Sequence, residues 1–217
     1  MNKKFDQIRY IGKDVATENI VPGSRVYGEK IEKKAGVEFR LWDPYRSKMA
    51  AALRQGVKTF PFKEDSKVLY LGAGNGTTVS HIADVCKHGF VYSVEFSPRA
   101  VTDLMMVADE RKNIIPILAN AKFPERYAEK VPQVDILYED VAQKGQVDIL
   151  KVNADKFLKQ DGYLFLMVKA RSIDVTKEPK YVFEVVANEL MENYKILERI
   201  KLDPYEKDHM CIVMQKK

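Results

Sequence analysis

The chain has 217 residues, of which 46% are hydrophobic and 31% are charged. This length suits one α/β domain with a small addition, and the hydrophobic content excludes a disordered polypeptide. Residues 1–60 hold 13 Lys or Arg against 7 Asp or Glu, whereas residues 61–217 hold 23 against 24, so the net charge of +5 originates in the first quarter of the chain. That surplus fits a polyanionic partner and equally fits an ordinary solvated surface.

Several functional classes lack their usual signals in this sequence. Cys86 and Cys211 are too few for a disulfide framework, and no His, Cys or Asp pattern has the spacing of a metal site. No GxSxG motif presents a hydrolase nucleophile. The first residues form no signal peptide, and the longest apolar run, residues 163–168, is far shorter than the roughly 20 residues of a membrane span. We expect a soluble, metal-free protein of the cytoplasm.

The first 43 residues predict a small antiparallel β unit. Three alternating segments, residues 7–12, 25–32 and 36–42, are separated by the turn sequences VPGS and KKAG. Residues 44–56 predict a helix that begins at Asp43-Pro44, contains the helix formers MAAAL and ends at Gly56. Together these elements define an expected N-terminal domain over residues 1–55, with the helix as its link to the rest.

Residues 56–217 predict an α/β domain. Strand-like segments alternate with helical ones at residues 67–72, 90–96, 113–118, 134–140 and 162–170, which implies a parallel sheet covered on both faces. Residues 194–202 and 209–215 are separated only by DPYEKD, a hairpin length, so the last strand is expected to run antiparallel to the others. A Rossmann-like, mostly parallel seven-stranded sheet with one antiparallel strand favours a methyltransferase domain over a dinucleotide-binding one.

A glycine-rich loop, GAGNGTT at residues 72–78, follows the first strand of this domain. Glycines at alternate positions allow a tight turn and a close approach to a ligand, and the next helix offers free N–H groups. The following strand ends at Glu95, 19 residues beyond Gly76, where a carboxylate can accept hydrogen bonds from both ribose hydroxyls. Loop and acid together predict an adenosine-type cofactor. NAD and S-adenosylmethionine share this arrangement, and the antiparallel last strand favours the latter.

Polar side chains converge at the carboxyl edge of the predicted sheet, where ligands bind in open α/β folds. Asp140 and Lys169 close two parallel strands and His209 opens the antiparallel one, so all three are expected at that edge. Lys48 lies on a different helix face from the neighbouring arginines and could point inward. Each residue also has an ordinary explanation: Lys169 as a solvated strand end, Asp140, near Gln143, as a helix cap, and His209 as a structural residue.

Six segments resemble the fibrillarin family in its archaeal, fibrillarin-like branch. They are RLWDPYRSKMAAAL, LGAGNGTTVSHIADV, VYSVEFSPRAVTDL, NIIPILANAKFPERY, VDILYEDVAQKGQ and DPYEKDHMCIVM, in this order along the chain. The resemblance implies an S-adenosylmethionine-dependent RNA 2′-O-methyltransferase that acts within box C/D guide ribonucleoproteins on rRNA and tRNA. The partners that it implies are a box C/D guide RNA, a Nop-domain scaffold protein and a kink-turn-binding protein of the ribosomal type.

The resemblance also assigns roles to residues. The family's catalytic Lys-Asp-Lys-His set falls on Lys48, Asp140, Lys169 and His209. Its cofactor-binding set falls on Gly72, Ala73, Gly74, Gly76, Thr77, Thr78, Glu95, Phe96, Asn120, Ala121, Asp140 and Gln143, with Glu95 on the ribose and Phe96 beside the adenine. Two departures from the family pattern are visible. Gly74-Asn75 stands where Ala-Ser is usual, and Asn120 replaces an Asp that receives the adenine amino group, so the amide must present its oxygen there.

Methyl transfer would require a base for the 2′-hydroxyl. An ordinary lysine, with a pKa of about 10.4, is protonated at neutral pH, but burial or a second cation lowers that value. Lys48 could supply the cation for Lys169 as base, with Asp140 and His209 orienting the pair and the ribose. Three alternatives remain: a guide-independent RNA methyltransferase, an NAD-dependent dehydrogenase that uses the same loop, and a non-catalytic ribonucleoprotein subunit. Calorimetry of cofactor binding separates the last two from the first.

Overall fold

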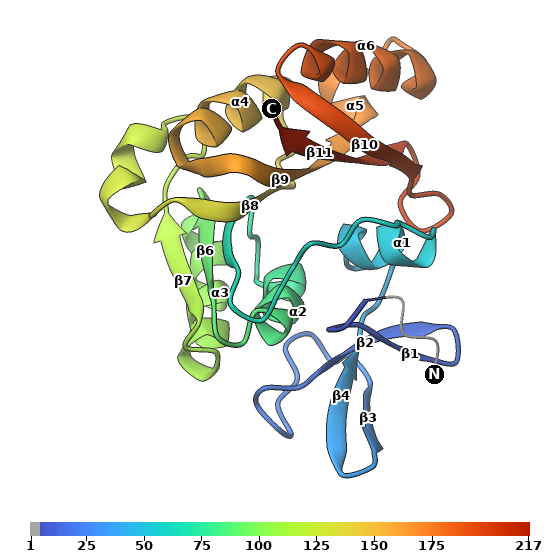
Figure 1. Cartoon of the computed structure of the whole chain (residues 1–217), viewed down its shortest axis with the longest axis vertical. Coiled ribbons are helices and arrows are strands. Elements are labelled where there is room, and N and C mark those ends of the chain that lie inside the picture. The colour runs from blue at the N-terminus through green and yellow to red at the C-terminus, as the bar shows by residue number, and fades with distance from the viewer. Residues whose placement is uncertain (1–4) are drawn as a thin grey trace.

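The computed structural model describes residues 5–217, so the first four residues of the expected N-terminal domain lie outside the described part. Two sheets organise the chain (Figure 1). The smaller sheet is antiparallel, with strands in the order β1-β2-β4-β3. Its strands are β1 (Arg9–Ile11), β2 (Asp14–Glu18), β3 (Ile31–Lys34) and β4 (Val37–Leu41). The expectation of a small antiparallel N-terminal unit is confirmed.

Two details of this unit differ from the sequence prediction. Residues 25–32 were expected to form one strand, but only Ile31 onward does so. The Glu29 carboxylate accepts the backbone N–H groups of Val26 and Tyr27, which folds this segment into a turn and removes its donors from a ladder. Strand β2 was not predicted. Its three central residues are all buried, because β2 lies inside the sheet and beside α2, and it therefore shows no alternation.

The linking helix α1 (Lys48–Arg54) begins four residues later than predicted. Asp43 accepts the N–H of Tyr45 in a turn, and the helix starts instead from Ser47, whose side chain accepts the N–H of Ala50. Such a serine satisfies one of the free donors of the first turn. The end agrees with the prediction, because Gly56 has φ +90° and follows the last helical turn.

The larger sheet has the order β10-β11-β9-β8-β5-β6-β7. Its strands are β5 (Lys67–Leu71), β6 (Phe90–Glu95), β7 (Ile114–Leu118), β8 (Val134–Glu139), β9 (Leu158–Lys169), β10 (Tyr194–Lys201) and β11 (His209–Lys216). All neighbours are parallel except β11, which pairs antiparallel with both β9 and β10. The predicted mostly parallel sheet with one antiparallel strand is confirmed.

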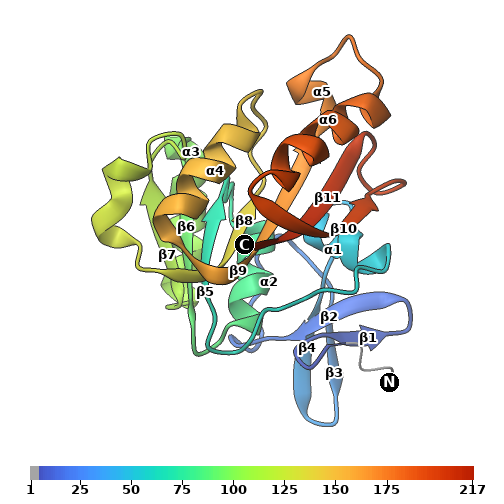
Figure 2. The ribbon, with the colours of Figure 1, turned by 45° about the horizontal axis from the view of Figure 1, so that its top comes forward.

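Helices cover both faces of the larger sheet (Figure 2). They are α2 (Thr77–Val85), α3 (Pro98–Glu110), the 3₁₀ helix η1 (Pro124–Lys130), α4 (Gln146–Phe157), α5 (Ala170–Ile173) and α6 (Pro179–Met191). Val68 and Tyr70 of β5 pack toward the core of α1, α2 and α3, whereas Leu69 and Leu71 pack toward that of α4 and α6. Because successive side chains of a strand alternate in direction, β5 is buried on both faces.

A buried ion network joins the smaller sheet to the larger body. Arg40 of β4 donates to Glu29 at 2.6 Å and to Asp84 of α2 at 2.6 Å. Arg111, just after α3, donates to the other oxygen of Asp84 at 3.1 Å and to the side chain of Asn19. The side chains of both arginines, Glu29 and Asp84 are fully buried. Arg40, Asp84 and Arg111 therefore each have a partner in the other part of the molecule, whereas Glu29 is held by Arg40 of its own part.

Candidate functional site

The glycine loop between β5 and α2 requires its glycines for two physical reasons. Gly72, Gly74 and Gly76 have φ values of +80°, +54° and +90°, in the left-handed region that other residues avoid. A Cβ atom on Gly72 would lie 2.5 Å from the carbonyl oxygen of Asp140. The loop and Asp140 are thus in direct contact, so that the predicted cofactor loop lies against one predicted catalytic residue.

Glu95, at the end of β6, organises the same loop. One carboxylate oxygen accepts the N–H of Gly74 at 2.9 Å, and the other accepts the N–H groups of Phe96 and Ser97 at 2.9 Å each. The residue is 8% exposed. A carboxylate has about four acceptor positions, so three backbone bonds fix its orientation and leave room for a hydroxyl donor. The spacing argument therefore placed Glu95 correctly beside the loop.

The remaining predicted cofactor residues lie along this edge in different settings. Phe96 is 64% exposed and can offer a ring face to a base. The Asn120 side-chain oxygen accepts the N–H of Lys122 at 3.0 Å, so Asn120 forms a turn as an ordinary loop asparagine does. Ala121 is buried, and its carbonyl accepts from Asn153 at 2.8 Å. Gln143 is half-buried in the segment before α4.

A cavity of about 470 Å³ opens where the loop meets α1 and β8. It is lined by Tyr45, Arg46, Tyr70, Gly72, Ala73, Gly74, Asn75, Thr77, Thr78, Asp140 and Glu206. Five of these residues were not predicted for the site: Tyr45, Arg46, Tyr70, Asn75 and Glu206. The sequence offers one clue to three of them, which is closeness in the chain to a predicted catalytic residue. Tyr45 and Arg46 lie just before Lys48, and Glu206 lies three residues before His209.

Lys48 and Asp140 form an ion pair at this cavity. The lysine Nζ lies 3.0 Å from Asp140 Oδ2, and the two side chains are 20% and 22% exposed. Burial opposes the charge on Lys48, but the attraction of Asp140, their hydrogen bond and the nearby Glu206 outweigh it and raise the pKa of Lys48 above its usual range. Asp140 does not cap the following helix, because α4 begins only at Gln146. The helix-cap explanation of Asp140 is wrong.

Lys169 and His209 lie opposite each other across the β9–β11 pairing. His209 is 7% exposed, and its Nδ1 lies 2.7 Å from the carbonyl oxygen of Lys207, so Nδ1 carries the proton and donates there. Lys169 is half-buried, and within residues 5–217 its ammonium group has no hydrogen-bonded or ionic partner. The topological argument thus places Lys169 correctly at the carboxyl edge, with an unengaged amine.

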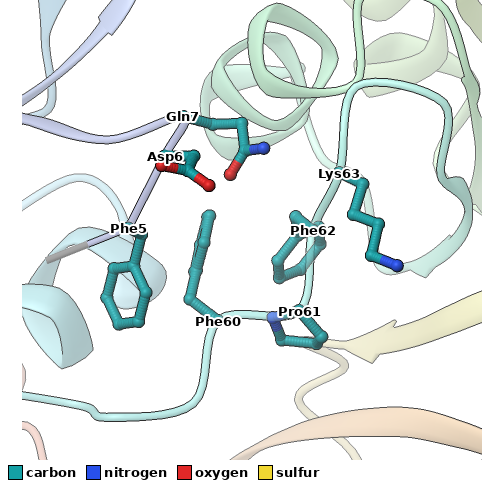
Figure 3. A pocket seen from close by; sticks show the side chains of 7 residues that line it. All are labelled: Phe5, Asp6, Gln7, Phe60, Pro61, Phe62 and Lys63. Carbon is teal, nitrogen blue, oxygen red and sulfur yellow. The ribbon is translucent and has the colours of Figure 1, made fainter.

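Other cavities offer weaker candidates. One of them has a volume of about 340 Å³. Figure 3 shows the rings of Phe5, Phe60 and Phe62 side by side in its lining. It precedes β5 in the chain, away from the carboxyl edge where open α/β sheets bind ligands, and no predicted site residue lines it. Residues 5–217 hold no group of three or more His, Cys, Asp or Glu side chains able to hold a metal ion. In the same residues no helix is long and apolar enough to cross a membrane.

The strand order, the single antiparallel strand and the glycine loop facing an ion pair at the carboxyl edge define an S-adenosylmethionine-dependent methyltransferase domain. Solved methyltransferases that are less than 25% identical share this fold. The fibrillarin family model matches residues 4–217, and the chain belongs to the fibrillarin family.

Known members of the family are similar over nearly the whole chain. The fibrillarin-like rRNA/tRNA 2′-O-methyltransferase of Pyrococcus abyssi is 51% identical over 203 residues, covering 93% of this chain and 89% of the relative. Aeropyrum pernix fibrillarin, solved with natively bound S-adenosyl-L-methionine, is 47% identical with a TM-score of 0.86, covering 93% and 88% of the two chains. Fibrillarin solved in a fibrillarin/Nop5p complex is 41% identical with a TM-score of 0.91, covering 97% and 98%.

Proposed function

We propose that this protein transfers a methyl group from S-adenosylmethionine to the 2′-hydroxyl of a ribose in RNA. The observation that carries the proposal is the Lys48–Asp140 ion pair, whose Asp140 lines the same cavity as the glycine loop. The P. abyssi relative carries the name of this activity, and the A. pernix relative was solved with the same cofactor. We assign cofactor binding to the loop residues 72–78, Glu95, Phe96, Asn120, Ala121, Asp140 and Gln143.

The four polar residues divide the chemistry between them. S-adenosylmethionine supplies the methyl group on a sulfonium sulfur, which is itself the leaving group. Lys169, which has no acidic partner within residues 5–217, accepts the hydroxyl proton on its Nζ in the neutral amine form as the oxygen attacks, and the sulfur leaves as a neutral thioether. The negative charge of Asp140 is compensated by its ion pair with Lys48. Asp140 therefore positions Lys48 and does not form an ion pair with Lys169. His209, anchored through Nδ1 and opposite Lys169 in the sheet, orients the ribose.

We further propose that the target is chosen by a partner complex. The family resemblance and the solved fibrillarin/Nop5p complex support a Nop-domain scaffold protein. A box C/D guide RNA and a kink-turn-binding protein would complete the assembly, which would act on rRNA and tRNA in the cytoplasm. The main contribution of this complex to catalysis would be to orient the target ribose, because a correctly held hydroxyl reacts as if it were present at very high concentration.

The proposal is tested by two measurements on the wild-type protein. Calorimetry should show binding of S-adenosylmethionine and none of NAD, which separates a methyltransferase from a dehydrogenase. Methylation of an RNA paired with a matching guide should then occur in the reconstituted complex, at the nucleotide that the guide selects. Failure to bind S-adenosylmethionine would favour a non-catalytic subunit, and methylation without any guide would favour the guide-independent enzyme.

A further inference from the structure

Ser47 connects the helix that carries Lys48 to the helix that follows the cofactor loop. Its Oγ accepts the N–H of Ala50 at 3.2 Å, which begins α1. The same oxygen accepts the hydroxyl of Thr78 in the first turn of α2 at 3.0 Å. Ser47 is 1% exposed, so neither bond competes with water. One buried oxygen therefore fixes two elements that are 31 residues apart in the chain.

The other end of this connection reaches the cavity. Thr78, whose hydroxyl donates to Ser47, lines it together with Tyr70. Burial and the nearby Asp140 hold the pKa of Tyr70 well above its usual range, so this hydroxyl keeps its proton. The Thr78–Ser47 hydrogen bond thus leads from the cavity wall to the residue immediately before Lys48.

The placement of Lys48 depends on the start of α1. This helix has only 7 residues, a length at which a helix is not stable by itself and relies on packing and on its cap. Lys48 is its first residue, so its direction toward Asp140 is set by the turn that Ser47 closes. Met49 to Leu53 are packed in the core of the larger sheet, so packing holds the helix as a whole, and Ser47 adds the hydrogen bond at the end that carries Lys48.

We propose that Ser47 is a positioning residue that transmits occupancy of the cofactor cavity to Lys48. A cofactor held against Thr77 and Thr78 fixes the first turn of α2, and the Thr78–Ser47 hydrogen bond then fixes the first turn of α1 with Lys48 against Asp140. The inference rests on the proposed function for the identity of the cofactor. It makes cofactor binding the step that completes the catalytic arrangement before the ribose arrives.

Three variants separate the connection from the cap. Ser47→Ala removes both hydrogen bonds, and Ser47→Thr keeps an oxygen able to make both. Thr78→Val removes only the bond between the two helices and leaves the cap of α1 in place. Ser66→Ala is the matched control, because Ser66 is also a buried serine whose hydroxyl accepts a backbone N–H, from Lys63, but it lies before β5 and far from Lys48 along the chain.

The first readout is hydrogen exchange of the α1 amides with and without saturating S-adenosylhomocysteine. In the wild type, Ser47→Thr and Ser66→Ala, the ligand should slow exchange at residues 48–54 by about tenfold or more. In Ser47→Ala and Thr78→Val, the bound ligand should leave these rates unchanged. The second readout is methylation by the assembled complex at saturating cofactor, where Ser47→Ala should lower kcat at least tenfold with little change in the KM for RNA.

The inference would be overturned if the ligand slowed exchange in Ser47→Ala or Thr78→Val as much as in the wild type. It would also be overturned if the kcat of Ser47→Ala equalled that of Ser66→Ala. If Ser47→Ala fails to fold, Thr78→Val alone decides. A wild type that binds S-adenosylhomocysteine and slows exchange in α1, yet methylates no RNA, would leave the connection standing and reject the proposed function. A wild type that does not bind the ligand would reject both.

Discussion

Glu95 has two tasks that compete for one carboxylate. It holds the glycine loop through three backbone N–H groups and is assigned to the ribose hydroxyls. We predict that Glu95→Ala weakens S-adenosylmethionine binding by about 1.5–3 kcal/mol, or roughly 10- to 150-fold, because the charged acceptor is lost. Calorimetry measures the change, and Glu64→Ala, an exposed carboxylate paired with Lys87, should bind as the wild type does. An unaltered affinity in Glu95→Ala would remove Glu95 from the site.

Lys169 should be essential for chemistry and dispensable for cofactor binding. We predict that Lys169→Ala abolishes methyl transfer in the assembled complex while the affinity for S-adenosylmethionine stays within about twofold. Lys169→Arg should be equally inactive, because a guanidinium cannot accept the proton. Lys159→Ala, at the other end of the same strand and paired with Asp135, serves as the control and should retain activity. If Lys169→Ala kept a tenth of the wild-type rate, Lys169 would be only a solvated strand end.

The sequence predicted the residues of the site that follow from topology, and missed those that follow from packing. Asp140, Lys169 and His209 were placed by one rule, since parallel strands end at a common edge and an antiparallel strand begins there. Ser47 and Glu206 have no such rule. Ser47 contacts Thr78 in the cavity wall, and Glu206 lines the cavity, because α1 packs against β11 and the 203–208 turn folds back toward the site. These contacts join residues far apart in the chain.

At the scale of elements, the prediction was accurate where burial is periodic and inaccurate where side chains bind the backbone. The strands of the larger sheet were found from their apolar runs, and the hairpin of β10 and β11 from its short turn. The start of α1 was misplaced because the Asp43 side chain accepts a backbone N–H and forms a turn of its own. The segment before β3 was wrongly predicted as a strand because the Glu29 carboxylate accepts backbone N–H groups there. Aspartate and glutamate can offer the backbone such alternatives to helix and strand, and composition does not reveal which is taken.

His81 of α2 makes the contact between the two sheets sensitive to pH. Its ring stacks on Trp42 at 4.6 Å, and its Nε2 lies 2.7 Å from the Tyr27 hydroxyl. Burial, together with Arg40 and Arg111, holds the pKa of His81 well below its usual range. The unfolded chain therefore binds a proton near pH 6.5 that the folded protein does not. Stability from this residue is complete above that pH and is lost as the pH falls below it.

We predict that the free energy of unfolding of the wild type falls by about 1 kcal/mol between pH 7.0 and 5.5 on account of His81 alone. Urea denaturation at the two pH values measures it. His81→Gln, which keeps an acceptor for Tyr27, should lose this part of the dependence. His88→Gln should keep it, because His88 is exposed. An identical pH dependence in His81→Gln and the wild type would show that His81 is protonated in the folded state.

At the scale of the whole molecule, the charge distribution argues against independent RNA binding. The surplus in residues 1–60 is 13 − 7 = 6 charges, and part of it is buried in the Arg40 network or paired as Lys48 is. A protein that binds nucleic acid unaided typically engages about 6–10 phosphates, and such binding weakens steeply as salt rises. The charge that remains exposed falls short of that requirement.

We therefore predict that the isolated protein loses most of its RNA affinity between about 50 and 200 mM salt, whereas the complex with a Nop-domain protein, a kink-turn-binding protein and guide RNA does not. Methylation of the same guide-paired RNA by the protein alone and by the complex, both near 150 mM salt, is the decisive comparison. Equal rates would contradict the need for a scaffold.

The buried network around Arg40 limits how the two parts of the chain can be recombined. We propose the division into residues 1–55 and 56–217, but Asp84 and Arg111 belong to the second part and find their partners in the first. Consider a chimaera that joins this N-terminal sheet to the methyltransferase domain of a distant relative. It would leave at least one buried charge without a counterion unless all these positions were transferred together. The two parts form separate sheets, but neither can be exchanged without the buried partners in the other.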